Sequence, residues 1–207
     1  MISRLDTPHG ACVLVELAER EDVERALAQL PAEEQAHAAT LAELRRREHA
    51  GGRFALHHAI GDFATPILAD DRGAPRLPAG WVGSVSHKAT LAAALVAPAA
   101  GAHVGLDLER AAPPKVDIAR RILTPREQAA LPVDAVERGR AMTRAFAIKE
   151  AIYKAVDPFV RRYVGFLEVE VDVDAGCIVT SELGLLIEAS WCEHAGFWIA
   201  TARASRD

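Results

Sequence analysis

Three carboxylates and two lysines in the second half of the chain have the types and spacings that phosphoryl-type chemistry needs. Asp107 and Glu109 are two residues apart in "AHVGLDLER", and Glu150 lies between Lys149 and Lys154 in "AFAIKEAIYKAV". Carboxylate oxygens are ligands that Mg²⁺ prefers, and lysines neutralise phosphate charge. The pattern predicts a site where acids hold a hard cation while lysines contact phosphates.

The strand expected over residues 102–109 places two of these acids on one face. Alternate side chains of a strand share a face, so Asp107 and Glu109 are about 6 to 7 Å apart along the backbone. Two such acids repel each other unless a cation lies between them. Taken alone, the pair fits an exposed strand end better than a metal site. A third carboxylate from Glu150 reverses that preference if its helix packs near the strand.

The helix that carries Glu150 has aromatic residues among its charges. At 100° per residue, residues 145–156 form an apolar stripe, and Phe146 and Tyr153 fall on the opposite, charged side. Either the spacing is accidental, or this side is also covered and lines a substrate cleft. We expect the second, because free helix faces seldom carry two aromatics.

A possible anion site precedes these elements. Ser86 and His87 in "SVSHK" follow a Gly- and Pro-rich loop over residues 70–80 that contains Arg72. A lone histidine is usually structural, but a histidine after such a loop, with an arginine upstream, favours anion binding.

The charge distribution favours an acidic partner over nucleic acid. The net charge is −5, which argues against general nucleic-acid binding. Residues 110–162 nevertheless carry a net charge of +6. These charges are either solvated helix faces or a docking patch that includes Arg120, Arg121 and Arg126.

Other composition features indicate a cytoplasmic protein without membrane contact. No run approaches the roughly 18 apolar residues of a membrane helix, and the N-terminus lacks the pattern of a signal peptide. The three cysteines are scattered and form no CxxC pair, so they are expected to be packing residues.

The element pattern and an internal repeat predict an α+β fold with two similar halves. "FALHHAI" from Phe54 and "FAIKEAI" from Phe146 match at four of seven positions, although chance is a serious alternative for so short a match. We expect halves of residues 1–101 and 102–207, related by a pseudo-twofold, each a small, mainly antiparallel sheet packed with helices. Helices are predicted over 19–30, 31–60, 118–131 and 135–156, the last ending at Asp157–Pro158, and strands over 81–97, 102–109, 166–173, 177–182, 185–193 and 196–204.

Three of these motifs, in this order, resemble the signatures of the 4′-phosphopantetheinyl transferase superfamily: "GSVSHKAT", "VGLDLE" and "FAIKEAIYKA". The larger, single-chain type is most similar, in particular the branch of enterobactin synthase component D. "ILTPREQ" and "YVGF" strengthen the resemblance, which runs from about Arg47 to Phe166.

The resemblance implies transfer of the 4′-phosphopantetheine arm of coenzyme A to a serine of an apo carrier protein. Asp107, Glu109 and Glu150 of the second half would hold Mg²⁺, or Mn²⁺ in its place. Lys154 would contact the α-phosphate and assist proton transfer, and Glu150 is a candidate base. The second half would also dock the acidic acyl or peptidyl carrier protein.

The first half would supply most of the coenzyme A contacts. Arg53, Arg72, Ser86 and His87, together with Lys149 of the second half, are the candidate contacts. Many relatives have a lysine in a "GKP" loop where this chain has residues 73–75, Gly-Ala-Pro, so Arg72 is taken to replace that charge.

The resemblance also suggests assembly and pathway. Small relatives of about half this length are trimers, so a fused chain is expected to be an active monomer with one coenzyme A site. The branch points to siderophore, polyketide or nonribosomal-peptide biosynthesis, a part of secondary metabolism. Two alternatives stay open: a Mg²⁺-dependent phosphodiesterase or pyrophosphatase, and an inactive module that binds carrier proteins.

Overall fold

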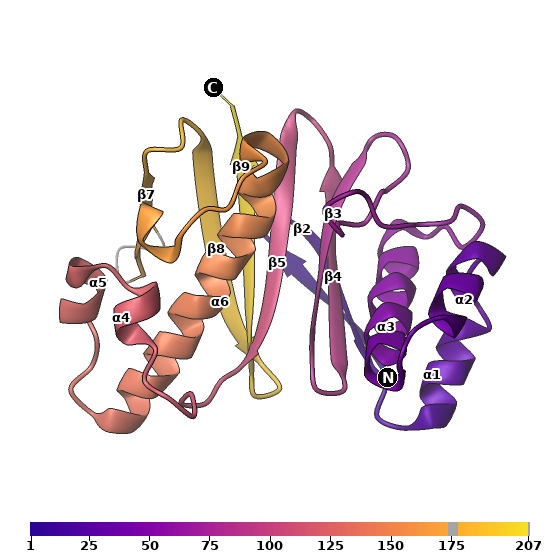
Figure 1. Cartoon of the computed structure of the whole chain (residues 1–207), viewed down its shortest axis with the longest axis horizontal. Coiled ribbons are helices and arrows are strands. Elements are labelled where there is room, and N and C mark those ends of the chain that lie inside the picture. Colours follow the sequence, from indigo (N-terminus) through magenta and orange to yellow (C-terminus); the bar gives the residue numbers. More distant parts are fainter. Residues whose placement is uncertain (174–177, 207) are drawn as a thin grey trace. The chain divides into compact units, whose positions relative to one another are not determined.

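The chain divides into two compact units, unit 1 (Met1–Ala100) and unit 2 (Gly101–Asp207). The computed structural model describes residues 1–173 and 178–206 (Figure 1). The division lies one residue before the boundary proposed from the sequence. Within the described residues, no helix combines the length and the apolar character that a membrane crossing requires.

Unit 1 is a four-stranded antiparallel sheet packed with helices (Figure 1). The strands lie in the order β1–β2–β4–β3, with bounds β1 Ile2–Thr7, β2 Gly10–Glu16, β3 Trp81–Lys88 and β4 Leu91–Pro98. The helices are α1 Arg20–Leu27, α2 Ala32–Ala39 and α3 Glu43–Ile60. The core of this unit joins valines of β2 to the helices, with Leu56 of α3 fully buried.

Glycines let α3 approach the sheet of unit 1 closely. A Cβ on Gly51 would lie 2.6 Å from the Cβ of Ala92 on β4, and one on Gly52 would contact Val85 of β3. A larger side chain at position 51 would therefore push helix and sheet apart.

Unit 2 has a three-stranded antiparallel sheet in the order β5–β9–β8 and a separate two-stranded sheet, β6–β7. Their bounds are β5 Ala102–Arg110, β6 Val169–Asp172, β7 Ile178–Ser181, β8 Leu186–His194 and β9 Phe197–Ser205. The helices are α4 Ala119–Ile122, α5 Pro125–Ala129, α6 Ala135–Val160 and the 3₁₀ turn η1 Phe166–Glu168. The long helix α6 lies along β5 (Figure 1).

The two units share one plan, which confirms the predicted α+β fold with two similar halves. In each unit a strand is followed by short helices, one long helix and an antiparallel hairpin whose second strand pairs with the first strand. The order β2–β4–β3 of unit 1 thus corresponds to β5–β9–β8 of unit 2.

The sequence did not predict the N-terminal hairpin of β1 and β2. The reason lies in β2, where residues 12–15 are all buried. A strand that is covered on both faces shows a continuous apolar run instead of alternation, and periodicity does not identify it.

Three predicted helix boundaries were also wrong. The helix expected over 31–60 is interrupted at residues 40–42, and the helix expected over 118–131 is two short helices. The second break occurs because Thr124 caps a new helix that starts at Pro125. Helix α6 continues through Pro158 to Val160, because a proline in the last turn removes only one intrahelical hydrogen bond.

The predicted C-terminal strands are present with shifted ends. The segment expected as a strand from residue 166 begins instead with the η1 turn and becomes β6 at Val169. Cys177, at the start of the next predicted strand, lies outside the described residues.

Candidate active site

The face of β5 that carries Asp107 and Glu109 packs against α6. Gly105 is on this face, and a Cβ added to it would lie 1.9 Å from the carbonyl oxygen of Ala151. Residues two apart on a strand share a face, so Asp107 and Glu109 also point toward α6. The absence of a side chain at Gly105 lets the helix come close enough for its charged residues to reach the strand.

Lys154 joins α6 to β5 at this place. Its Nζ donates hydrogen bonds to Asp107 Oδ1 and to the carbonyl oxygen of Leu106, both at 2.8 Å. Asp107 is buried, with 7% of its surface exposed. The ammonium group therefore compensates part of the cost of a buried carboxylate.

Glu150 lies within electrostatic reach of the same groups, one turn before Lys154 on α6. Burial raises the pKa of Glu150 above its ordinary value, and the negative charge of Asp107 raises it further. Lys154 lowers this pKa and Glu109 raises it, each less strongly than burial. Lys154 and Asp107 are therefore in direct contact, and Glu150 interacts electrostatically with Asp107, Lys154 and Glu109.

The three acids Asp107, Glu109 and Glu150 have the donor type that a hard divalent cation prefers. In residues 1–173 and 178–206, no three His, Cys, Asp or Glu side chains are arranged to hold a metal ion by themselves. The three acids nevertheless offer only oxygen ligands, and the charges of Asp107 and Glu109 add to the effect of burial in raising the pKa of Glu150. A cation would relieve that repulsion, and Mg²⁺ commonly takes one or two carboxylates plus phosphate oxygens.

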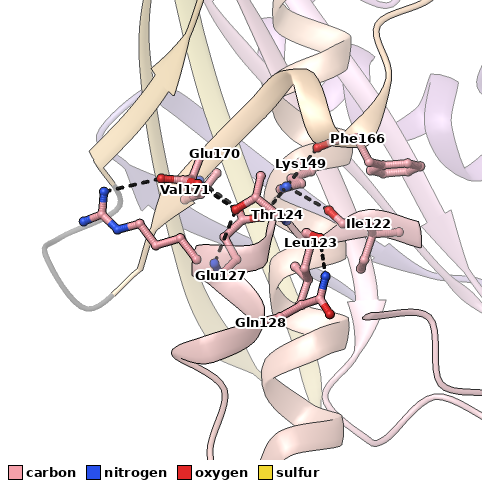
Figure 2. A network of polar contacts seen from close by, with 10 residues as sticks. Ile122, Leu123, Thr124, Glu127, Gln128, Lys149, Phe166, Glu170 and Val171 are labelled. Carbon is pink, nitrogen blue, oxygen red and sulfur yellow. Dashed lines mark hydrogen bonds and ion pairs between the residues drawn. The ribbon is translucent and has the colours of Figure 1, made fainter. Parts of the chain in front are cut away.

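Lys149 is placed away from any substrate surface, which argues against its predicted contact with coenzyme A. The side chain is fully buried. Its Nζ donates to Glu127 Oε2 at 2.7 Å and to the carbonyl oxygens of Ile122 at 2.8 Å and Phe166 at 2.9 Å (Figure 2). An ammonium group has three donors, and all three are used inside unit 2.

Phe146 and Tyr153 both pack on Phe166, which follows α6 in the chain. The ring centroids are 5.6 Å apart for Phe146 and 5.1 Å apart for Tyr153. The charged side of α6 is thus covered at these two positions, and the hydroxyl group of Tyr153 is buried without a hydrogen-bond partner.

In unit 1, Ser86 and His87 are neighbours on β3, and His87 is linked to α3. His87 Nε2 lies 3.0 Å from Glu48 Oε1, and Glu48 also pairs with Arg45. Ser86 is buried, whereas the His87 side chain is 39% exposed. His87 is therefore held in place by a carboxylate while part of its ring remains accessible.

The two predicted phosphate-binding arginines lie in different places of unit 1. Arg53 is buried on α3, where burial lowers its pKa and the charge of Glu34 partly opposes this effect. Arg72 lies in an exposed turn in which Asp70 Oδ1 accepts hydrogen bonds from the backbone N–H groups of Arg72 at 2.8 Å and Ala74 at 2.9 Å. Only Arg53 is thus on the helix that holds His87.

Sequence reasoning gave no role to Glu127 or Glu48, the acids that fix Lys149 and His87. Glu127 had a detectable signal, because the order Thr124-Pro-Arg-Glu127 is a capping box. Glu48 had none, since its partner is distant in the sequence.

Family comparisons match nearly the whole region from α2 to β9. Residues 32–97 match the 4′-phosphopantetheinyl transferase N-terminal domain, and residues 103–202 match the 4′-phosphopantetheinyl transferase superfamily. The match therefore begins before Arg47 and extends beyond Phe166, the limits of the resemblance seen in the motifs.

Two named relatives agree with this result. The chain is 34% identical to enterobactin synthase component D of Salmonella typhi over 54% of this chain, and it spans about half (48%) of that relative. It is 33% identical to 4′-phosphopantetheinyl transferase Npt of Nocardia iowensis, covering 76% of this chain and 72% of Npt. A holo-(acyl-carrier-protein) synthase structure from Bacillus anthracis, in complex with CoA (3′,5′-ADP), covers 50% of this chain and 96% of its own at 23% identity and a TM-score of 0.40. By the family matches and the similarity to Npt, this chain belongs to the 4′-phosphopantetheinyl transferase superfamily.

Proposed function

We propose that this chain transfers the 4′-phosphopantetheine group of coenzyme A to a serine hydroxyl of an apo carrier protein. The observation that carries the proposal is the Lys154–Asp107 ion pair between α6 and β5, within electrostatic reach of Glu150, in a member of this family. In the reaction, the serine oxygen bonds to the β-phosphorus of coenzyme A, the pyrophosphate P–O bond breaks, and 3′,5′-ADP leaves.

The carboxylates of unit 2 are the proposed metal ligands. Asp107, Glu109 and Glu150 would hold Mg²⁺, or Mn²⁺ in its place. The chemistry that this ion supplies is neutralisation of charge on the pyrophosphate. Glu150 is also the proposed acceptor of the serine proton, because burial and its acidic neighbours favour its protonated form.

Lys154 is the proposed contact of the α-phosphate. Its ammonium group is already held by Asp107 and the Leu106 carbonyl, so it is positioned before the substrate arrives. A preorganised charge stabilises the developing negative charge of the leaving group without reorganisation.

The remaining proposed contacts concern the nucleotide and the arm of coenzyme A. Ser86, His87, Arg53 and Arg72 of unit 1 are assigned to the nucleotide phosphates. His87 is the best supported of these four, because it is partly exposed and oriented by Glu48. The covered side of α6 that carries Tyr153 is assigned to the substrate cleft of unit 2.

The proposed acceptor is an acidic acyl or peptidyl carrier protein. Arg120 and Arg121 are exposed on α4 and can steer such a partner. Arg126 is already paired with Glu170 at 3.4 Å and Asp172 at 3.2 Å, so it is expected to add less. The relatives named for enterobactin synthesis make carriers of secondary metabolism the first ones to test.

Incubation with coenzyme A, Mg²⁺ and a panel of apo carrier proteins tests the proposal. A gain of the phosphopantetheine mass on a carrier, with release of 3′,5′-ADP, is the expected result. Cleavage of coenzyme A without modification of any carrier would instead indicate a phosphodiesterase or pyrophosphatase. Carrier binding without any reaction would indicate an inactive module.

We also propose that the chain acts as a monomer with one coenzyme A per chain. The shared plan of the two units supports this, since a fused pair of similar halves needs no partner subunit. Light scattering combined with calorimetric titration checks it. An obligate trimer, or less than one coenzyme A per chain, would refute the monomer and leave the chemistry open.

A further inference from the structure

Glu127 and Lys149 form a buried ion pair (Figure 2). The ammonium group of Lys149 makes three hydrogen bonds, and both carboxylate oxygens of Glu127 accept hydrogen bonds. Beyond its bond to Lys149, Glu127 Oε2 accepts from the backbone N–H of Thr124 at 2.6 Å. Glu127 Oε1 accepts from the N–H of Val171 at 2.8 Å. The pair therefore ties α6 to α5 and β6, and through the Phe166 carbonyl to η1.

Unit 1 contains the same kind of pair at the matching place in its fold. Glu34 Oε1 lies 2.8 Å from His57 Nε2, and both side chains are fully buried. Glu34 Oε1 also accepts from the N–H of Ile67 at 2.6 Å, as Glu127 does from Val171. In both units the acid lies on a short helix and the cation on the long helix that follows.

The sequence repeat aligns the two pairs. Superposing "FALHHAI" on "FAIKEAI" places His57 at Lys149 and His58 at Glu150. The two acids are each followed by Gln-Ala, and each glutamine side chain donates to the carbonyl five residues earlier, Gln35 to Leu30 and Gln128 to Leu123. Because unit 1 has the pair without the carboxylates of β5, the pair belongs to the repeated fold rather than to substrate binding.

The residue after the cation of each pair differs between the units. Lys149 of unit 2 is followed by Glu150, a proposed reacting group, whereas His57 of unit 1 is followed by His58. The contact of α6 with β5 near Glu150 is made by small residues, Ala151 and Ala155 against Gly105. At this contact the backbone of α6 lies against Gly105, so no side chain of α6 is wedged between helix and strand there. Lys149, directly before Glu150, makes three hydrogen bonds to other segments of unit 2 and can thereby fix the orientation of the helix at Glu150.

We propose that Glu127 and Lys149 are positioning residues that hold Glu150 toward Asp107 and Glu109. This proposal rests on the proposed transferase function. The pair also holds Phe166, on which Tyr153 packs, so it fixes one wall beside Glu150. A displacement of about 1 Å at a reacting group can cost about 100-fold in rate.

The test compares the full chain with the double variant Glu127→Gln/Lys149→Met in the carrier assay. Removal of both charges avoids an unpaired buried charge, so this variant is expected to fold. We expect kcat to fall about 10- to 100-fold, while KM for coenzyme A stays within about threefold. Glu127→Asp, which keeps the charge but shortens its reach, is the second variant and should lose less.

Met142→Ala is the matched control for stability. Met142 lies on α6 and packs with Ile122 of α4 and with Leu123, so its loss weakens these contacts without altering the ion pair. It is expected to lower the melting temperature while kcat changes less than about threefold. Hydrogen exchange of backbone amides over residues 146–154, measured without substrates, should rise only in the ion-pair variants.

The outcomes separate this proposal from the proposed function. No transfer by the unaltered chain would refute the function, and the exchange measurement would still judge the positioning role. An active double variant with normal kcat and normal exchange would overturn the positioning role. A raised KM for coenzyme A with unchanged kcat would also overturn it and would return Lys149 to substrate binding.

Discussion

The long helices α3 and α6 occupy the same place in their units, but they approach their sheets by different means. In unit 1 the glycine is on the helix, where Gly51 meets Ala92 of β4. In unit 2 the glycine is on the strand, where Gly105 meets the backbone of α6. The second solution leaves the helix positions near the contact available for Glu150 and Lys154, so one architecture can carry chemistry in only one of its copies.

The residues that follow the cations of the two ion pairs, His58 after His57 and Glu150 after Lys149, also differ between the units. His58 of unit 1 packs against Phe54 and Phe63, and burial lowers its pKa. Glu150 of unit 2 is surrounded by charges, and its pKa is raised. A shared ion pair thus precedes an apolar contact in one unit and the candidate active site in the other.

Substitution of Glu150 should change the transfer rate most, and substitution of His58, at the matching position of unit 1, should change it little. Glu150→Gln keeps the shape but removes a proposed metal ligand and base, so the transfer rate should fall about 10³-fold or more. Asp107→Asn should behave similarly, and Glu109→Gln should be milder because water can replace one ligand. His58→Gln is the matched control and should retain transfer. Mass spectrometry of the carrier measures all four.

Near-normal turnover by a folded Glu150→Gln protein would remove the basis for the metal-site assignment. An equal loss in His58→Gln would show that the position matters for folding in both units.

Breaking each of the two ion pairs should lower the free energy of unfolding by a different amount. Lys149→Met leaves the Glu127 carboxylate buried without its cation, and the free energy of unfolding should fall by about 3–5 kcal/mol. His57→Leu removes two hydrogen bonds where Lys149→Met removes three, so its loss should be smaller, about 1–3 kcal/mol. Urea unfolding measures both. A larger loss for His57→Leu would mean that the unit 1 pair carries more of the stability.

The unit 1 pair should also respond to pH near neutrality. His57 Nδ1 contacts the carbonyl oxygen of Asp62 and Nε2 contacts Glu34, so both nitrogens must donate and the ring is charged. Burial lowers the pKa of His57, but these two hydrogen bonds and the charges of Glu34 and Asp62 together outweigh burial and raise it overall. With the folded pKa above the unfolded one, the stabilisation is complete below about pH 6.5 and is lost as the pH rises through the folded value.

The difference in unfolding free energy between the unaltered chain and His57→Leu isolates this contribution. It should decrease as the pH is raised from 6 to 9. His49 does not imitate the effect, because burial lowers its pKa to about 4, and its charge is lost below this range. A difference that stays constant with pH would indicate that the ring is neutral throughout.

The smallest expected effect concerns carrier docking. Arg120→Gln/Arg121→Gln should raise KM for an acidic carrier about two- to fivefold and weaken its salt dependence, with KM for coenzyme A unchanged. Arg126→Gln is the control, since its charge is already paired with Glu170 and Asp172. Equal changes for both substrates would place these arginines in the active site instead.

The sequence by itself determined the elements of the candidate site that depend on local periodicity. Asp107 and Glu109 share a face because strand side chains alternate, and Lys154 follows Glu150 by one helical turn. The ordered motifs then indicated the family, which the comparisons confirmed. The matching heptapeptides also indicated two similar halves, since a repeated fold requires the same apolar positions twice.

Only the tertiary structure decided which segments of the chain pack against each side of α6. From spacing alone Lys149 and Glu150 are equivalent charges on one helix. Lys149 was assigned to coenzyme A, and Glu150 was assigned to the metal ion and as a candidate base. The structure buries Lys149 completely against Glu127, whereas Glu150 interacts electrostatically with Asp107. Periodicity reports which residues share a face, but the partner of a face is set by segments distant in sequence. For Lys149 those segments are a capped turn at Thr124 and a 3₁₀ turn at Phe166, and no local pattern links them to the helix.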